Sequence, residues 1–341
     1  MAKRVITFGE IMLRLAPEGY HRFVQADKLQ ATFGGGEANV SVSLANYGMD
    51  SVFVTRLPRH EIGEAGVNSL RKYGVDTSYI SRGGNRVGIY FLEKGASQRP
   101  SKVIYDRAGS AIANAKPKDF EWDIIFDGAS WFHFTGLTPA LGGNMAAICI
   151  EACKRAQQKG IPISCDLNYR KNLWTKEEAG KTMSELCQYV DVCIANEEDA
   201  ADVFGIKSEG TNVATGQVNH EGYKEVAKKL TERFPFKKVA ITLRESLSAS
   251  DNNWAGMLYD GHDYYFSKTY PVHIVDRVGG GDSFGAGLIY ATLSDYPPQD
   301  TIEFAVAASC LKHSIEGDFN LVSVEEVKKL ADGDASGRVQ R

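Results

Sequence analysis

The stretch Val-Asp-Arg-Val-Gly-Gly-Gly-Asp-Ser-Phe-Gly-Ala-Gly, residues 275–287, joins three consecutive glycines to a pattern of small residues that predicts a helix. Gly279, Gly280 and Gly281 allow backbone N–H groups to converge and to approach a ligand closely. A helix that begins here adds N–H donors without intrahelical partners and a partial positive charge. The stretch therefore predicts an anion-binding site of the kind that holds phosphate.

Asp282 directly follows the three glycines, so its carboxylate would lie beside any anion bound there. A carboxylate does not help to bind phosphate, but it can accept a proton from a hydroxyl that attacks the phosphorus. The stretch therefore indicates phosphoryl transfer, with Asp282 as general base and the glycines as the catalytic backbone. The alternative is a glycine-rich turn that packs a helix against a strand, and a short motif alone leaves it open.

A second glycine run lies in Gly34–Asn39, which reads Gly-Gly-Gly-Glu-Ala-Asn and precedes a helix pattern that ends at Gly48. The simpler interpretation is a strand–helix turn with Asn39 in the first turn of the helix. Three glycines are more than such a turn needs, so the run also predicts close approach of a ligand to the backbone.

From Trp131 to Leu243 strand and helix patterns alternate, which is typical of a parallel sheet with helices on both faces. Ligands of such sheets bind beyond the carboxyl ends of the strands. Polar residues recur there, and each one alone is typical of a helix cap or a turn. Their recurrence favours a binding site. These residues are Asp166, Asn168, Arg170, Asn196, Asp199, Thr242 and Arg244.

Two alternating segments, Arg86–Leu92 and Lys102–Arg107, predict a hairpin. Tyr105 and Arg107 are two residues apart and face the same side of a strand. An arginine beside Tyr90 and Tyr105 would suit a small carboxylate ligand, because the guanidinium group matches its two oxygens. Spacing alone favours the alternative, an exposed strand face with a cation–π contact.

Composition limits the class of protein. With 341 residues the chain is long enough for one large α/β domain or two smaller ones. The net charge of −4 offers no electrostatic basis for binding nucleic acid or an anionic membrane. No apolar run reaches transmembrane length, and the start has no signal-peptide pattern. The six cysteines lack CxxC pairing, so we expect free thiols and a cytoplasmic protein.

Other segments carry less information. Lys207–Gly222 is polar without periodicity and is predicted to be a surface loop, and the tail Asp332–Arg341 is predicted to be frayed. Thr175 stands where a P-loop ending at Lys181 would need its first glycine, and no GxGxxG follows the first predicted strand, Arg4–Glu10. The sequence therefore argues against a Walker A site and against a nicotinamide dinucleotide site.

The two glycine motifs, in this order and with this alternating core, resemble the carbohydrate kinases of the ribokinase (PfkB-type) family over residues 4–330. Asp276–Asp282 is similar to the family's C-terminal motif, with Gly280 where alanine is usual, and Gly34–Asn39 is similar to its N-terminal motif. The resemblance implies a ribokinase-like α/β fold with a central, mostly parallel sheet flanked by helices. It implies a single domain over residues 1–341, with a small β-sheet lid from about residues 10–33 and 85–110.

Within the family, the chain is most similar to the sugar-acid kinases that act on 2-keto-3-deoxygluconate. That similarity rests on Tyr90, Tyr105–Arg107, Asp166–Arg170 and Gly317–Asn320. It implies transfer of phosphate from ATP to a terminal hydroxyl, with Arg107 on the substrate carboxylate and Arg170 near the transferred phosphate. The Gly34 backbone and Asp318 would hold hydroxyls. The implied substrate-binding residues are Gly34, Gly35, Asn39, Tyr90, Tyr105, Arg107, Arg170 and Asp318.

The resemblance also implies ATP with Mg²⁺ along the sheet edge. The family's Asn-x-x-Glu metal motif reads Asn196-Glu197-Glu198-Asp199 here, so Asp199 is the candidate metal ligand. Some family members bind a monovalent cation such as K⁺ near the segments that match residues 276–278 and 314–317. Arg244 stands where glycine is frequent. The implied nucleotide-binding residues are Asp166, Asn168, Asn196, Thr242, Arg244, Gly279 and Gly281.

Three alternatives remain open: a kinase of a neutral sugar such as fructose or ribose, a non-catalytic sugar-binding relative, and a nucleoside kinase. Arg107 and its tyrosines argue against the first, and Asp282 with its glycines argues against the second. Besides the sugar acid and ATP, we expect a second copy of the chain as a partner through the lid, because an exposed lid strand can pair with another.

Overall fold

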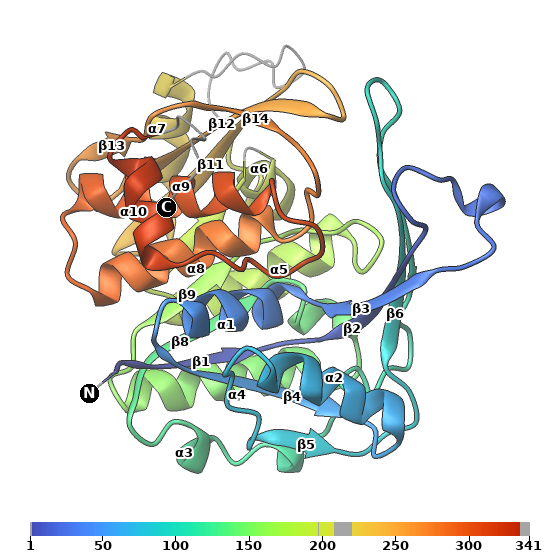
Figure 1. Cartoon of the computed structure of the whole chain (residues 1–341). Coiled ribbons are helices and arrows are strands. Elements are labelled where there is room, and N and C mark those ends of the chain that lie inside the picture. The colour runs from blue at the N-terminus through green and yellow to red at the C-terminus, as the bar shows by residue number, and fades with distance from the viewer. Residues whose placement is uncertain (1, 197, 208–219, 335–341) are drawn as a thin grey trace.

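The computed structural model describes residues 2–196, 198–207 and 220–334. One large sheet runs through the molecule in the order β13-β12-β11-β10-β9-β8-β1-β4-β5, with β14 also paired to β12 (Figure 1). The strands from β11 to β5 are parallel, and β12, β13 and β14 add an antiparallel edge. Its strands are β1 (Arg4–Phe8), β4 (Asp50–Leu57), β5 (Ile80–Arg82), β8 (Ala129–Thr135), β9 (Ile163–Asp166), β10 (Val192–Ala195), β11 (Lys238–Ser246), β12 (Asp251–Tyr259), β13 (Tyr264–Phe266) and β14 (Tyr270–His273).

Helices cover both faces of this sheet. The helices are α1 (Gly36–Asn46), α2 (Glu61–Arg71), α3 (Trp122–Ile125), α4 (Met145–Gln158), α5 (Lys176–Leu186), α6 (Asp199–Phe204), α7 (His220–Arg233), α8 (Gly280–Leu293), α9 (Pro298–Lys312) and α10 (Val324–Ala331). Short 3₁₀ helices lie at Phe23–Gln25, Pro117–Asp119, Pro139–Leu141 and Cys187–Tyr189. Strand residues alternate between the faces: Val5 packs in the core beneath α1, α8, α9 and α10, whereas Ile6 packs in the core with α3 to α7.

A second, smaller sheet stands apart from the helices, at the right of Figure 1. Its order is β3-β2-β6-β7, formed by β2 (Met12–Ala16), β3 (Gln30–Gly34), β6 (Gly88–Glu93) and β7 (Lys102–Asp106). These four strands come from the two segments that the sequence assigned to a lid, so we call this small sheet the lid.

The mostly parallel sheet with flanking helices and a small lid confirms the predicted fold class. β5 has three residues and β14 contains Pro271, so neither gave a strand pattern that could be recognised. The loop prediction for Lys207–Gly222 is wrong at residues 220–222, which begin α7, and residues 208–219 lie outside the described residues. The predicted frayed tail lies outside them from residue 335 onward. All six cysteines are free thiols. Across the described ranges, no helix combines the length and the apolarity needed to span a bilayer.

Helices α8 and α9 pack closely through a glycine. A Cβ added to Gly287 would lie 2.9 Å from the Cα of Ala305. Close packing here fixes the axis of α8, and therefore the position of the glycine run at its N-terminus.

We predict that Gly287→Val lowers the free energy of unfolding by about 1–3 kcal/mol, because the added atoms force the two helices apart. Urea denaturation followed by circular dichroism measures this. Gly281→Ala in the same helix is the control, since no neighbouring atom lies within 4 Å of the Cβ it adds. Equal stability of the two variants would contradict the packing argument.

Candidate functional site

A cavity of about 430 Å³ lies at the carboxyl ends of the central strands, between the large sheet and the lid. Most of the site residues predicted from the sequence line it, although Gly34, Gly280 and Asp199 do not. The structure therefore brings together residues from the lid, the strand ends and both glycine runs. The predicted residues in its wall are Gly35, Asn39, Tyr90, Tyr105, Arg107, Asp166, Asn168, Arg170, Asn196, Thr242, Arg244, Gly279, Gly281, Asp282 and Asp318.

Helix α8 points its first turn at this cavity. Gly279 is the N-cap and has φ of 84°, a left-handed conformation that favours glycine. A side chain there would also collide with the backbone, because an added Cβ would lie 2.1 Å from the carbonyl oxygen of Asp318. The first N–H groups of a helix have no intrahelical acceptor, so this turn can bind an anion.

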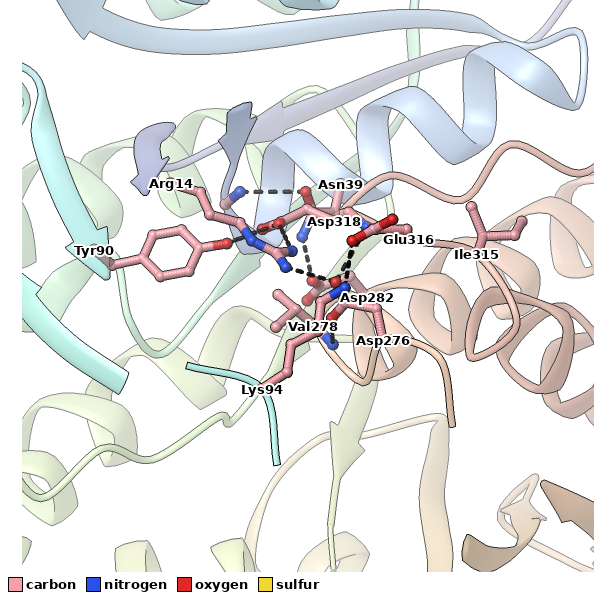
Figure 2. Close-up of polar contacts among 12 residues, drawn as sticks. Arg14, Asn39, Tyr90, Lys94, Asp276, Val278, Asp282, Ile315, Glu316 and Asp318 are labelled. Carbon is pink, nitrogen blue, oxygen red and sulfur yellow. Dashed lines mark hydrogen bonds and ion pairs between the residues drawn. The ribbon is translucent and has the colours of Figure 1, made fainter. Parts of the chain in front are cut away.

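Asp282 lies in the first turn of α8 and lines the cavity. The side-chain amide of Asn39, in α1, donates a hydrogen bond of 2.7 Å to its Oδ2 (Figure 2). Burial raises the pKa of Asp282 to about 7; the Asn39 hydrogen bond opposes this shift, and the charges of Glu37 and Asp318 add to it. A carboxylate with a pKa near neutrality is suited to general-base catalysis.

Arg14, on β2 of the lid, forms the central ion pairs of the site (Figure 2). It contacts Asp276 at 2.6 Å and Asp318 at 2.8 Å, and its side chain is only 3% exposed. Tyr90, on β6, donates its hydroxyl to Asp318 at 2.6 to 2.7 Å. Burial disfavours the charge on Arg14, but Asp276 and Asp318 outweigh that effect and raise its pKa. Sequence reasoning missed Arg14 because its partners lie more than 250 residues away.

The tip of the lid makes further contacts with the main body. Lys94, just beyond β6, pairs with Glu316 (Figure 2). Ser97 donates its backbone N–H to Ser250 Oγ at 2.9 Å and accepts a bond of 2.7 Å from the N–H of Ala249. The lid is therefore attached both near the α8 glycines and at the β11–β12 turn.

The second glycine run is packed against protein atoms. A Cβ at Gly34 would lie 1.9 Å from Asp318 Oδ2, and one at Gly35 would lie 2.0 Å from the carbonyl oxygen of Glu10. These two glycines allow close approach of the chain itself. Asp318 is buried, and its carboxylate accepts bonds from both Arg14 and Tyr90.

Arg107 has a carboxylate partner inside the protein. Its Nε and Nη2 donate to Glu10 Oε2 at 2.8 and 2.5 Å, and Ser110 donates to the other oxygen of Glu10 at 2.6 Å. The guanidinium carbon also lies 5.5 Å from the centre of the Tyr105 ring. The exposed-face alternative holds for Tyr105, which is 44% exposed, and is wrong for Arg107, which is 8% exposed.

Asp199 joins two of the loops at the strand ends. Its carboxylate accepts the backbone N–H of Tyr169 at 3.0 Å and that of Asn196 at 3.1 Å. Asp166, in the cavity wall, has its pKa raised by burial and by the charges of Asp199 and Asp282. Within residues 2–196, 198–207 and 220–334, no three His, Cys, Asp or Glu side chains form a metal-binding group. A divalent ion at this site would need ligand oxygens and water to complete its shell.

Among the lining residues that were not predicted are Trp254, Arg277 and His313. The Nδ1 of His313 lies 2.7 Å from the carbonyl oxygen of Ser309, and its ring lies 4.9 Å from that of Trp254. Burial lowers the pKa of His313 to about 4, so it is neutral at pH 7. Arg277 belongs to the first glycine motif and could have been found from it, whereas His313 had no signal.

Known proteins resemble this chain along its whole length. Residues 2–320 match the family model described as pfkB family carbohydrate kinase. A solved 2-dehydro-3-deoxygluconokinase of Thermotoga maritima is 54% identical, with a TM-score of 0.94 and 98% of this chain and 99% of that chain covered. A PfkB family carbohydrate kinase of Listeria grayi is 33% identical, with a TM-score of 0.89 and coverage of 97% and 100%. A 2-dehydro-3-deoxygalactonokinase of Haloferax volcanii is 28% identical over 337 residues, 99% of each chain.

The raised pKa of Asp282 predicts a pH-dependent stability. An exposed aspartate has a pKa of about 3.9, whereas that of folded Asp282 is about 7. At a pH between these two values, Asp282 is protonated in the folded state and ionised in the unfolded state. The stability that this proton contributes is complete below the pKa of the unfolded state, and it is lost as the pH rises through the pKa of the folded state. Asp282→Asn has no such proton to lose.

We therefore expect the melting temperature of Asp282→Asn, relative to the unsubstituted protein, to increase from about pH 5 to pH 8. Thermal unfolding across this range measures the difference, with the exposed Asp127→Asn as the background control. A difference that does not change with pH would show that Asp282 ionises as an ordinary carboxyl.

Proposed function

The chain belongs to the pfkB family of carbohydrate kinases, and from that premise we propose that it is a 2-keto-3-deoxygluconate kinase. It transfers the terminal phosphoryl group of ATP to the terminal hydroxyl of this sugar acid, which is the compound also called 2-dehydro-3-deoxygluconate. The observation that carries the proposal is the 54% identity to the Thermotoga maritima 2-dehydro-3-deoxygluconokinase over nearly the whole of both chains. A half-buried carboxylate in the first turn of a helix whose N-terminus can bind an anion supports it.

In the proposed reaction, Asp282 accepts the proton of the terminal hydroxyl while the hydroxyl oxygen forms a bond to the γ-phosphorus. The bond from that phosphorus to the β–γ bridging oxygen breaks, and ADP leaves. Asn39 orients the carboxylate through its 2.7 Å hydrogen bond. The N–H groups at Gly279–Asp282 stabilise the charge on the transferred group, and each such donor is worth about 10²–10³-fold in rate. The lid excludes water, which limits hydrolysis of ATP.

The proposal assigns the two ends of the cavity to different substrates. Asn196, Thr242 and Arg244 at the strand ends hold ATP, together with Arg277, and the lid side holds the sugar acid. Mg²⁺ fits the wall at Asp166, the carboxylate there that is neither the base nor paired with Arg14. Asp166 would be the protein ligand, phosphate oxygens and water would supply the others, and the ion would offset the charge on the phosphates. Asp199 would support this ion indirectly, by holding in place the two loops that it joins.

A second candidate substrate is the C4 epimer, 2-keto-3-deoxygalactonate. The relative from Haloferax volcanii, which is 28% identical over 99% of both chains, is named 2-dehydro-3-deoxygalactonokinase. Both epimers present the same carboxylate and the same terminal hydroxyl, so the machinery proposed here serves either.

The function is tested by coupled detection of ADP with both epimers, gluconate, fructose and ribose. We expect the highest kcat/KM for 2-keto-3-deoxygluconate or its epimer. A higher value for fructose or ribose would make the protein a neutral-sugar kinase, and absence of ADP with every sugar acid would favour a non-catalytic relative.

The base role of Asp282 gives a kinetic prediction. We expect Asp282→Asn to retain ATP binding, measured by calorimetry, and to lose at least about 10²-fold in kcat. In the unsubstituted enzyme kcat/KM falls as the pH drops below about 7, because the base becomes protonated. Near-normal turnover in the variant, or a pH profile that is flat through 7, would remove Asp282 from the base role.

Arg107 is proposed to contact the substrate carboxylate with the part of its guanidinium group that faces the cavity. Substituting Arg107 alone would leave Glu10 buried without its partner, so the matched background is Glu10→Gln. In that background we expect Arg107→Met to raise KM for the sugar acid by about 10–100-fold, the worth of one charged hydrogen bond. If KM for fructose rises by the same factor, the carboxylate assignment is wrong.

The lid is proposed to pair with that of a second copy. All five residues of its edge strand, β7, are exposed in the single chain, among them Val103 at 40% and Ile104 at 45%. Exposed apolar edge strands favour pairing with another strand. Light scattering should give the mass of a dimer or a larger even assembly; a monomer would contradict the proposal.

A further inference from the structure

Lys312, the last residue of α9, is a charged side chain in the core of the protein. It is 0% exposed and is among the largest fully buried side chains in the described part of the chain. The residues assigned to the reaction do not include it. Burying an ammonium group costs several kcal/mol unless nearby groups compensate the charge. Its surroundings should therefore explain why it is there.

The ammonium group lies beside the loop that binds the anion. Lys312 Nζ donates a hydrogen bond of 3.0 Å to the carbonyl oxygen of Ile315, a residue labelled in Figure 2. Its Cε lies 3.2 Å from the position that a Cβ on Gly279 would take. The side chain therefore lies against the N-cap of α8, and it is not part of the cavity wall.

Two segments of chain meet at this point and are held together by Asp276. Its Oδ1 accepts the N–H of Val278 at 3.2 Å, and its Oδ2 accepts the N–H of Gly317 at 3.1 Å. The N–H of Val275 also donates to the carbonyl oxygen of His313 at 2.8 Å. Lys312 contacts one of these segments through Ile315 and the other through Gly279, so it lies at their junction.

The local charges explain the need for a cation. Burial lowers the pKa of Lys312, whereas the charges of Asp276, Asp318 and Asp282 oppose that shift. Arg14 pairs directly with two of these carboxylates but belongs to the lid sheet, and Arg170 and Arg277 lie in the cavity wall. The three carboxylates lie next to a loop that, in the proposed function, accepts a polyphosphate. A fixed cation beneath the loop offsets their repulsion at short range.

We propose that Lys312 is a built-in cation of the phosphate-binding loop, which fixes residues 276–279 against residues 313–318 and makes an added monovalent cation unnecessary. This inference rests on the proposed function. Lys312 is a positioning residue, because it acts through the loop and does not line the cavity. The resemblance to the family implied a K⁺ ion near these two segments. We propose that the ammonium group of Lys312 takes the place of that ion.

The test begins with the unsubstituted enzyme, assayed at constant ionic strength in choline, sodium and potassium chloride. We expect the same kcat in all three salts. We expect Lys312→Met to lower kcat by at least about tenfold, with a smaller change in KM for the sugar acid, an effect below the 10²–10³ of a direct anion-hole donor. Lys312→Ala leaves space at the junction, so potassium or ammonium should restore part of its kcat, whereas the bulkier Lys312→Met should not respond. Lys154→Met, an exposed lysine on α4, is the control for loss of a lysine.

Several results would overturn the proposal. The first is that the unsubstituted enzyme requires potassium or sodium. The second is that Lys312→Met folds and has a normal kcat. The third is that Lys312→Ala folds but no added cation restores its lost kcat. If neither variant folds well, their unfolding midpoints in ammonium and choline chloride decide: only Lys312→Ala should be stabilised by ammonium. If the unsubstituted protein turns over no sugar acid, the proposed function fails. Affinity for a fluorescent ATP analogue, measured with the same variants and salts, then tests Lys312 separately.

Discussion

The proposed reaction depends on holding a carboxylate and a polyphosphate next to each other at the positive end of one helix. Asp282 occupies the first turn of α8, where its own charge competes with that of any bound anion. Partial burial keeps its pKa near 7, and the Asn39 amide keeps its orientation. A carboxylate under these conditions can accept a proton near neutral pH and repels the phosphate less than a fully ionised one. In this proposal, the glycines around it let backbone N–H groups, and not side chains, bind the anion.

The second constraint is the connection of the lid to this helix terminus. Arg14 on β2 contacts Asp318, which also accepts the Tyr90 hydroxyl, and Asp276, which holds the loop before α8. Removing one partner from such a buried pair typically costs about 3–5 kcal/mol, so the lid and the loop are strongly coupled. A ligand that moves Tyr90 would therefore also displace the α8 glycines, because two charged contacts connect them. This arrangement offers a physical route by which occupancy of the lid side affects the phosphate side.

The sequence predicted the local features of the fold and of the candidate site. The glycine run at Gly279–Gly281 predicted a helix terminus open to an anion, and the alternation from Trp131 to Leu243 predicted the parallel sheet whose strand ends form the cavity wall. It could not reveal contacts between distant segments: Arg14 pairs with a residue 304 positions away and Glu10 with one 97 positions away. Such pairs leave no periodicity in the chain. Lys312 was missed for a different reason, because a lysine at the end of a helix usually lies in solvent.

The most direct measurement is a structure of the protein with 2-keto-3-deoxygluconate and a non-hydrolysable ATP analogue bound together. The account predicts the terminal hydroxyl within hydrogen-bond distance of the Asp282 carboxylate, in line with the γ-phosphorus, and the γ-phosphate oxygens over the N–H groups of Gly279–Asp282. A ternary complex in which another carboxylate contacts that hydroxyl, or in which the γ-phosphate lies away from the first turn of α8, would contradict it.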